Sequence, residues 1–249
     1  MSMHRFFVSP EQIGEKEIFI EGTDVNHIRN VLRMRPGEQL RLCTGTDQKD
    51  YRCEIMEITE TCVRSRILWV EENGVELPSK VFLFQGLPKS DKMELIIQKA
   101  VELGAYEIIP VASKRSVVKL DAKKAEAKGK RWNAISESAA AQSKRLLVPR
   151  VTEVMTFAQA VEYASGLDVK LIPYELARDM DMTRRILAEV APGQSVGIFI
   201  GPEGGFEEQE VELAMKAGTQ PITLGRRILR TETAGMAVLS MLNYLLEGR

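Results

Sequence analysis

The sequence has few of the residues that build disulfide, metal or histidine-dependent sites. Its three cysteines, Cys43, Cys53 and Cys62, form no CxxC pair, which argues against a disulfide framework or a structural zinc cluster. Both histidines, His4 and His27, lie near the start, so a Ser-His-Asp site or a multi-histidine metal site elsewhere is excluded. We therefore expect no metal, and reduced thiols in a cytoplasmic protein.

Long hydrophobic runs and an excess of one charge are also missing. The first residues, MSMHRFFVSPEQ, hold no apolar core of signal-peptide length, and the longest apolar runs, such as Val196–Ile200, are only strand-sized. The formal net charge of −1 excludes a uniformly basic polyanion binder. With 44% hydrophobic and 28% charged residues, the 249-residue chain has ordinary globular composition, and its length predicts one or two domains.

The sequence pattern divides the chain near Leu77. From Phe6 to Val70, short runs of period two alternate with turns, and Asp24–Arg33 has apolar residues at helical spacing. This predicts a small β-barrel with one short helix, residues 1–75, followed by a polar linker over Glu71–Pro78. Beyond it, strands alternate with helices, which predicts an α/β domain, residues 76–249, with a mainly parallel sheet covered on both faces.

The α/β domain contains five predicted strands and four predicted helices. The predicted strands are Val81–Phe84, Ile108–Val111, Val169–Ile172, Val196–Ile200 and Pro221–Leu224. The predicted helices are Lys92–Leu103, Ala122–Ser143, Glu207–Ala217 and Thr231–Leu246.

The charge is unevenly distributed along the chain. Residues 1–78 carry a net charge of −4 and residues 79–249 a net charge of +3, whereas Lys114–Arg150 alone carries +8. A lysine-rich, solvated helix face would explain this segment. Its concentration within 37 residues equally fits a surface that binds the phosphate backbone of a nucleic acid.

The strongest local motif is GPEGGF, Gly201–Phe206, between a predicted strand and a predicted helix. Its glycines allow the backbone to approach a ligand closely, and ligands of open parallel sheets bind at the carboxyl ends of the strands. A tight strand–helix turn is the alternative interpretation. The loop matches neither GxGxxG nor GxxxxGK[ST], and neither pattern occurs elsewhere, which disfavours ordinary dinucleotide and P-loop sites.

The second motif, LGRRILRTETA (residues 224–234), also follows a predicted strand and opens a helix. Three arginines beside a helix N-terminus favour the binding of anions or carboxylates. The alternative for an arginine here is a structural ion pair with Glu203 or Glu232.

GPEGGF followed by LGRRILRTETA resembles the bacterial 16S ribosomal RNA uridine-N3 methyltransferases, which belong to the knotted SPOUT class of AdoMet-dependent enzymes. The resemblance covers nearly the whole chain. His4–Phe7 and His27–Gly37 are similar to the family's PUA-like RNA-binding domain, and Lys89–Gly104 to its first α/β segment. The basic segments Lys114–Ser116 and Ala139–Arg145, with Pro149 after the second, are similar to its remaining motifs.

The resemblance implies a fold, a cofactor and partners. The fold would be a PUA-like β-barrel followed by an α/β domain with a deep trefoil knot, acting as a homodimer on 16S rRNA, and the family expectation is the assembled 30S subunit. AdoMet would bind bent among three loops. By matching position, the residues implied to bind it are Ile172, Pro173, Glu175, Gly201, Pro202, Glu203, Gly204, Gly205, Leu224, Gly225, Ile228, Leu229 and Thr231.

Methylation of uridine N3 requires removal of its proton and stabilisation of the negative charge that develops on O2 or O4. Arg230 is the candidate for electrostatic stabilisation, since a guanidinium stays protonated and cannot be the base. Glu232 and Glu203 are the candidate bases, with a helix-terminus or salt-bridge role as the alternative for each. The candidate RNA contacts are Arg5, Arg33, Arg115, Gln142 and Arg145.

Two other functions remain open from the sequence. A knotted methyltransferase could instead modify a ribose 2′-hydroxyl of tRNA or rRNA, although the ILRTETA motif and the preceding β domain favour uridine N3. A non-catalytic RNA-binding or ribosome-assembly factor is the other alternative, and the intact glycines and arginines of both motifs argue against it.

Overall fold

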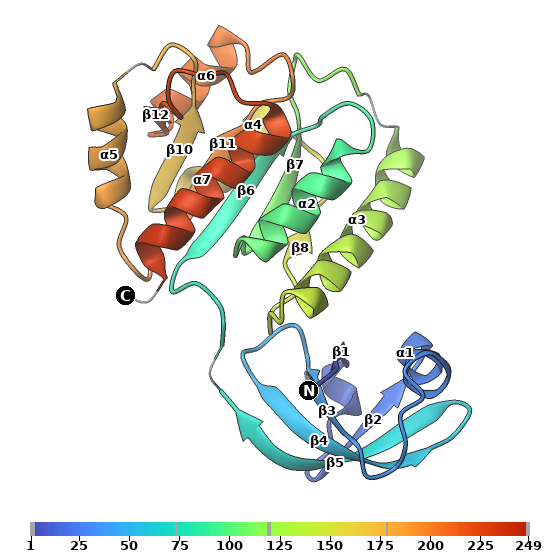
Figure 1. Cartoon of the computed structure of the whole chain (residues 1–249). Helices are drawn as coiled ribbons and strands as arrows, with labels where there is room; N and C mark the ends of the chain where they lie inside the picture. Colours follow the sequence, from blue (N-terminus) through green and yellow to red (C-terminus); the bar gives the residue numbers. More distant parts are fainter. Residues whose placement is uncertain (1–2, 73, 119–120, 178, 248–249) are drawn as a thin grey trace. The chain divides into compact units, whose positions relative to one another are not determined.

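The chain folds into two compact units, seen in a computed structural model that describes residues 3–72, 74–118, 121–177 and 179–247 (Figure 1). The first unit comprises Met1–Glu76 together with Ala140–Val148. The second comprises Leu77–Ala139 and Pro149–Arg249. The division after Glu76 lies one residue beyond the predicted boundary, whereas the inclusion of residues 140–148 in the first unit has no counterpart in the prediction.

The first unit is built on a curved five-stranded sheet with the order β1-β3-β4-β5-β2. Its strands are β1 (Arg5–Phe7), β2 (Glu17–Glu21), β3 (Gln39–Cys43), β4 (Asp50–Ile58) and β5 (Cys62–Glu71). β1 runs parallel to β3, and the other pairs are antiparallel. Alternate side chains of the strands enter one core, as the period-two pattern predicts. Among the described residues no pairing joins β1 to β2, so the predicted barrel is an open, curled sheet.

The predicted helix Asp24–Arg33 is shorter and less regular than the apolar spacing suggests. A single turn, α1 (Thr23–Asn26), passes into a π-helical turn over His27–Val31, where the Leu32 N–H donates to the His27 carbonyl at 2.9 Å. The wider turn buries Ile28 and ends at Arg33, whose φ of 55° is left-handed. A short 3-10 turn, Pro10–Gln12, precedes β2.

The second unit contains a wholly parallel sheet with the order β12-β10-β11-β6-β7-β8, and β9 pairs with β7 beyond β8. Its strands are β6 (Lys80–Gly86), β7 (Glu107–Ala112), β8 (Arg150–Val151), β9 (Met155–Thr156), β10 (Val169–Pro173), β11 (Ser195–Ile200) and β12 (Gln220–Ile222). The five predicted strands are confirmed; β8 and β9 were missed because each spans two residues.

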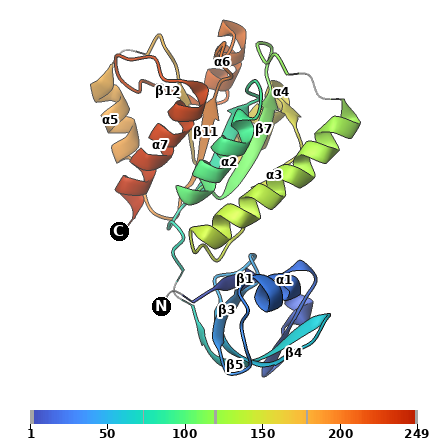
Figure 2. The same cartoon turned by 45° about the vertical axis from the view of Figure 1, so that its right-hand side comes forward.

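Helices cover both faces of this sheet, as the near-continuous apolar strands require. They are α2 (Lys92–Glu102), α3 (Ala122–Gln142), α4 (Phe157–Tyr163), α5 (Met180–Ala188), α6 (Glu208–Lys216) and α7 (Thr231–Leu246), with a 3-10 turn at Ala164–Gly166. α2 lies between α7 and α3, and α5 contacts α7 on the same face (Figure 2). α4 and α6 pack together on the other face over a core that includes Phe84, Phe157 and Phe199.

The stretch Glu71–Pro78, predicted as a polar linker, is partly structural. β5 extends to Glu71, and the Glu76 side chain is only 6% exposed. Asn73 lies outside the described residues. Within the part of the chain that the structure describes, no helix is long and apolar enough to span a membrane. The trefoil knot implied by the family resemblance concerns how the chain threads through itself and stays a prediction.

Candidate functional site

A cavity of about 1240 Å³ opens in the second unit, at the carboxyl ends of β10, β11 and β12. Three loops line it, residues 173–177, 200–206 and 223–231, and each leaves the sheet directly after one of these strands. Parallel strands place their carboxyl ends at one edge, so segments far apart in the sequence meet there. Both sequence motifs therefore contribute to one pocket.

The pocket contains nearly all of the predicted cofactor-binding residues. Those that line it are Pro173, Glu175, Gly201, Pro202, Glu203, Gly204, Gly205, Leu224, Gly225, Ile228, Leu229 and Thr231. Ile172, whose role in cofactor binding stays a prediction, is the exception: its side chain does not line the cavity and is fully buried in the core with Phe84 and Phe199. Alternation along the strand explains this, since neighbouring side chains point to opposite faces.

The glycine-rich loop is too tightly folded to accept side chains at its first position. A Cβ on Gly201 would lie 2.9 Å from the Gly205 Cα, and one on Gly86 would lie 2.6 Å from the Pro202 nitrogen. Gly205 has a φ of 67°, and its N–H donates to the Pro202 carbonyl at 2.9 Å. The loop therefore presents mostly backbone to the cavity, which suits close contact with a ligand.

The start of α7 is bonded to this loop through a buried chain of hydrogen bonds. The Gln85 amide donates to the Thr231 hydroxyl at 2.9 Å, and that hydroxyl donates to the Gly201 carbonyl at 2.6 Å. Thr231 is the first residue of α7. Arg230 occupies the N-cap position, and its side chain forms no capping hydrogen bond. The Thr231 hydroxyl therefore joins the two motifs, and Gln85 of β6 bonds to that hydroxyl.

Lys92, the first residue of α2, adds a charged contact at the pocket wall. Its ammonium lies 3.2 Å from Glu203 Oε1 and 3.3 Å from Glu232 Oε2. The hydrogen bond to Glu203 raises the pKa of Lys92, partial burial opposes this, and Glu232 adds to it. Burial raises the pKa of Glu203, but hydrogen bonds from the backbone and from Lys92 outweigh that effect and hold this pKa below its ordinary value.

The catalytic candidates therefore differ in their surroundings. Glu232, in the first turn of α7, is held in the ion pair with Lys92, which is the salt-bridge role left open from the sequence. Arg230 lines the pocket and is exposed, and among the described residues neither Glu203 nor Glu232 pairs with it. Arg226 and Arg227 line the same loop.

The chain is similar to known proteins over nearly its whole length. A family profile described as the RNA methyltransferase domain matches residues 75–243, and one described as the RNA methyltransferase PUA domain matches residues 20–67. The chain is 41% identical to the ribosomal RNA small subunit methyltransferase E of Bacillus subtilis, with 98% of each chain covered. It belongs to this methyltransferase family. The resemblance drawn from the two motifs is confirmed.

Solved structures support the same assignment over the full length. A ribosomal RNA small subunit methyltransferase E from Neisseria gonorrhoeae, bound to S-adenosyl methionine, superimposes with a TM-score of 0.85 at 33% identity, covering 98% of each chain. A putative methyltransferase from Legionella pneumophila, in complex with the bound cofactor SAM, does so with a TM-score of 0.86 at 32% identity and the same coverage. The predicted PUA-like and α/β architecture is confirmed.

The candidate RNA contacts fall into two groups. Arg33, Gln142 and Arg115 are exposed, and Arg115 also lines the pocket, where its guanidinium donates to the Gly204 carbonyl at 2.9 Å. Arg5 and Arg145 instead form buried ion pairs inside the first unit. Both guanidinium groups are paired with buried carboxylates and do not lie on the exposed surface, so they are not available as RNA contacts in this structure, and their interpretation as such is corrected.

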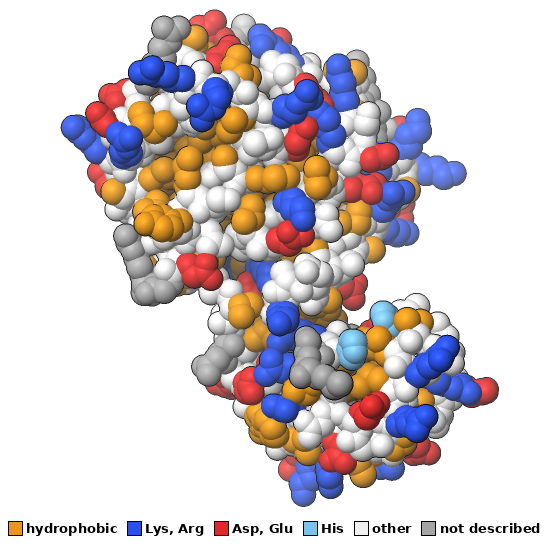
Figure 3. Space-filling view, viewed as in Figure 1, with side chains coloured by type: hydrophobic (Ala, Val, Ile, Leu, Met, Phe, Trp, Pro, Cys, Tyr) orange, Lys and Arg blue, Asp and Glu red, His pale blue; other side chains and the backbone are white. Residues whose placement is uncertain are grey.

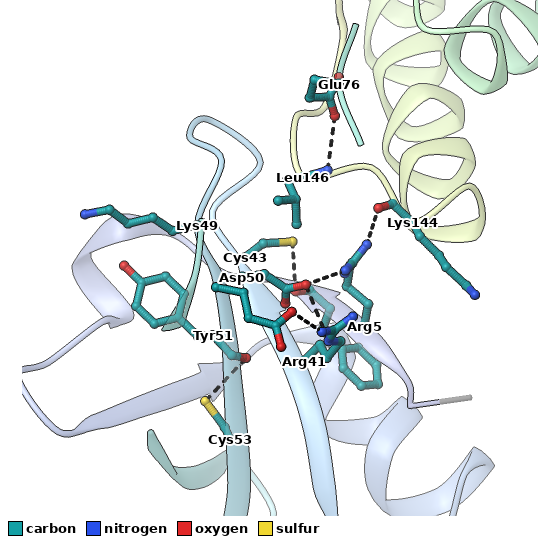
Figure 4. A network of polar contacts seen from close by, with 12 residues as sticks. Arg5, Arg41, Cys43, Lys49, Asp50, Tyr51, Cys53, Glu76, Lys144 and Leu146 are labelled. Carbon is teal, nitrogen blue, oxygen red and sulfur yellow. Dashed lines mark hydrogen bonds and ion pairs between the residues drawn. The ribbon is translucent and has the colours of Figure 1, made fainter. Parts of the chain in front are cut away.

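These buried pairs join distant segments of the first unit. Figure 4 shows the contacts of Arg5 with Asp50 and with the Lys144 carbonyl. Arg5 pairs with Asp50 at 2.5 Å and also donates to the Lys144 carbonyl. Arg145 pairs with Glu76 at 2.5 Å, and both side chains are 6% exposed. A charge is stable in such a place only when it is paired and hydrogen-bonded.

Sequence reasoning missed several residues of the pocket. Lys92, Met180 and Thr223 line it without having been singled out, whereas Tyr174, Phe206 and Ala234 line it and belong to segments already quoted for the loops and motifs. Lys92 belongs to a segment quoted for the family resemblance, but no local pattern indicates that the first turn of α2 meets two loops more than 100 residues later. In the described residues no group of three or more His, Cys, Asp and Glu side chains could hold a metal ion.

Proposed function

We propose that this chain is an AdoMet-dependent methyltransferase that modifies N3 of one uridine in 16S ribosomal RNA, with the assembled 30S subunit as its substrate in the cytoplasm. The observation that carries the proposal is the pocket at the carboxyl ends of β10, β11 and β12, where the GPEGGF and LGRRILRTETA segments meet. The full-length relationship to small subunit methyltransferases E supports rRNA as the substrate class.

The residues of the pocket fit the proposed cofactor. The cavity is large enough for a nucleoside-sized ligand, and the tightly folded loop of Gly201 and Gly205 offers backbone groups rather than side chains. Pro173, Leu224 and Leu229 supply apolar surface from the other two loops. The cofactor would contribute a methyl group on a sulfonium, and these three loops would hold and orient it.

The protein's own groups would prepare the uracil. Arg230 lies at the pocket without a carboxylate partner among the described residues, so its guanidinium is available for the negative charge that develops on O2 or O4 once N3 loses its proton. Of the two candidate bases, Glu232 is closer to Arg230 in the sequence, and its ion pair with Lys92 holds its carboxylate beside a side chain that lines the pocket. Positioning of the two substrates supplies the remaining rate enhancement.

RNA binding would involve the first unit and the basic segment Lys114–Arg150. After the correction above, Arg33, Arg115 and Gln142 stay as proposed contacts, and the excess charge of +8 marks the segment around two of them. If several phosphates are neutralised, affinity for 16S rRNA falls steeply as salt rises. A nearly salt-independent affinity would rule out this segment as the phosphate-binding surface.

The decisive experiment compares protein-free 16S rRNA with 30S particles from a strain that lacks the enzyme. Both are incubated with AdoMet, digested to nucleosides and mapped by mass spectrometry. We expect 3-methyluridine at one position, formed faster on 30S. A 2′-O-methylated nucleoside would support the alternative knotted methyltransferase, and a protein that binds 16S rRNA but gives no calorimetric signal with AdoMet would support a non-catalytic factor.

A homodimer is part of the same proposal. Apolar side chains gather on the face of the second unit that carries α7 (Figure 3). Leu95 on α2, Met182 on α5 and Tyr244 on α7 are all exposed, with Tyr244 at 86%. We expect wild type to sediment as a dimer and Tyr244→Glu to shift it toward monomer, whereas a wild-type monomer at micromolar concentration would contradict the proposal.

A further inference from the structure

Lys92 connects two walls of the pocket that the sequence motifs build separately. Its ammonium contacts Glu203 in the glycine-rich loop and Glu232 in the first turn of α7, both within 3.3 Å. The three side chains are 29%, 28% and 17% exposed, so the cluster is largely shielded from water. Lys92 itself lines the pocket from a third element, the start of α2.

The backbone around Lys92 reinforces this contact. The Lys89 N–H donates a bifurcated hydrogen bond to both carboxylate oxygens of Glu203, at 3.1 and 3.2 Å, so the segment before α2 also holds the glycine-rich loop. Among the described residues, the Glu232 carboxylate has no comparable bond to the backbone, and its contact is with Lys92. The position of the Glu232 carboxylate therefore depends on the ammonium.

One cation between two carboxylates also controls their mutual repulsion. With Lys92 in place the cluster carries one net negative charge; without it, two like charges on adjoining walls repel and favour separation. The other charged side chains that line the pocket in the described part of the chain are Arg115, Glu175, Arg226, Arg227 and Arg230. None of these five side chains forms an ion pair or hydrogen bond with the Glu203 or Glu232 carboxylate in the described part of the chain.

We propose that Lys92 is a positioning residue that fastens the glycine-rich loop to the first turn of α7, and that this fastening sets the affinity of the pocket for AdoMet. The second clause rests on the cofactor proposed above. Thr231 and Gln85 join the same two segments from the buried side, so Lys92 acts as the outer of two connections.

The test uses Lys92→Gln, Lys92→Arg and a matched control, Lys99→Gln, in the full-length protein. Lys99 lies on the same helix and pairs with Glu102 away from the pocket, so this variant removes one lysine charge and one ion pair from α2 without touching the cluster. Arginine at position 92 can still reach both carboxylates, and we expect it to retain most of the wild-type behaviour.

The first readout is amide hydrogen exchange without any ligand. The informative amides are that of Gly205, bonded to Pro202, and that of Ala234, bonded to Arg230. In Lys92→Gln we expect both to exchange about tenfold faster, with wild-type rates in Lys99→Gln. Unchanged exchange at both amides in Lys92→Gln would overturn the inference, whatever the protein binds.

The second readout is AdoMet binding by calorimetry, followed by single-turnover methylation against pH. We expect Lys92→Gln to weaken AdoMet binding by about tenfold and to move the acidic limb of the rate profile upward, because the hydrogen bond from Lys92 helps to hold the pKa of Glu203 below its ordinary value. If wild type binds AdoMet, and Lys92→Gln binds it with the same affinity and has the same rate profile, the effect on cofactor binding is overturned. A wild type that does not bind AdoMet overturns the proposed function, while faster exchange in Lys92→Gln still supports the positioning role.

Discussion

Arg230 is the pocket arginine whose position is easiest to interpret chemically. It directly precedes α7, is exposed at the cavity, and the two nearby glutamates are both occupied by Lys92. A positive charge beside a helix N-terminus is unfavourable by itself, so an exposed guanidinium there, without a carboxylate partner among the described residues, supports the role proposed for Arg230 toward a negatively charged uracil.

Arg230→Ala tests this role directly. We expect single-turnover methylation to fall by roughly 10²–10³, as for the loss of one donor to a developing anion, with AdoMet affinity changed less than threefold. Arg184→Ala is the control, because Arg184 lies on the surface of α5 in an exposed pair with Asp181. Near-wild-type turnover by Arg230→Ala with AdoMet bound would eliminate the electrostatic role.

The three cysteines have no part in this chemistry, and their surroundings predict how they respond to pH. Burial raises the pKa of the Cys43 thiol to about 12 and that of the Cys53 thiol to about 12 as well, while burial also raises the pKa of the less buried Cys62. At pH 8 the thiolate fraction of each buried thiol is on the order of 1000-fold below that of an unperturbed one.

Labelling with a thiol reagent at pH 8 should therefore modify Cys62 well before Cys43 and Cys53. Folding raises the pKa of each of these thiols. The contribution to native-state stability is fully present below the unfolded pKa, near 9, and it is lost as pH rises through the folded pKa of about 12. We expect urea midpoints of the first unit to fall across this range. Cys43→Ala/Cys53→Ala should show a shallower decline, and an equal decline would contradict the assignment.

Whether an individual charged side chain is exposed or buried could not be predicted from the sequence. Arg5 and Arg145 lie in or near basic stretches and were interpreted as RNA contacts, yet their partners Asp50 and Glu76 are 45 and 69 residues away. An ion pair formed at that separation leaves no local pattern, because it depends on which strands become neighbours. Residue type predicted the charge, and only the fold determines whether it is exposed.

At the scale of elements, the sequence predicted the long and strongly patterned segments. α7 begins and ends at its predicted residues, since a long apolar stripe follows an evident break at the arginine-rich loop. α4 and α5 were missed, although capping signals were present: Thr156 and Gln159 form a capping box, and Asp179 accepts bonds from two N–H groups of α5. The contact of Gln85 with Thr231 follows from the strand order and could not be predicted from local pattern.

Gly86, the last residue of β6, packs closely against Pro202 of the glycine-rich loop. A Cβ there would lie 2.6 Å from both the nitrogen and Cδ of Pro202, which are parts of a rigid ring and backbone that cannot yield easily. We expect Gly86→Ala to displace the loop and weaken AdoMet binding at least tenfold. Gly129→Ala, on α3 with open space around it, should bind AdoMet normally and be slightly more stable, by about 0.5–1 kcal/mol.

Calorimetry with AdoMet and thermal unfolding of the two glycine variants distinguish a loop effect from general destabilisation. If Gly86→Ala bound AdoMet with wild-type affinity, the loop would be able to move without affecting the pocket. That result would also weaken the case that its close packing shapes the cofactor site.

At the scale of the whole molecule, the two units are not two successive stretches of chain. Residues 140–148 leave the second unit at the end of α3 and pack within the first, where Leu147 pairs with Gly45 and the Val148 N–H donates to the Gly45 carbonyl at 2.8 Å. Composition and periodicity assign this segment to the α/β part of the chain because it continues a helix. Its packing is a tertiary property that the sequence pattern does not contain.

The Glu76–Arg145 pair should therefore be a principal support of the first unit. Glu76 also accepts hydrogen bonds from the Leu146 and Leu147 N–H groups, so it holds both the side chain and the backbone of the inserted segment. In Arg145→Ala the Glu76 carboxylate stays buried without its counter-charge, and we expect the free energy of unfolding of this unit to fall by about 3–5 kcal/mol.

Urea denaturation in a Trp132→Phe background lets Trp69, on β5, report on the first unit. Arg184→Ala, which removes an exposed pair, should change that free energy by less than about 1 kcal/mol. A similarly small loss in Arg145→Ala would mean that residues 140–148 are held by apolar and backbone contacts, and that the first unit does not depend on this ion pair.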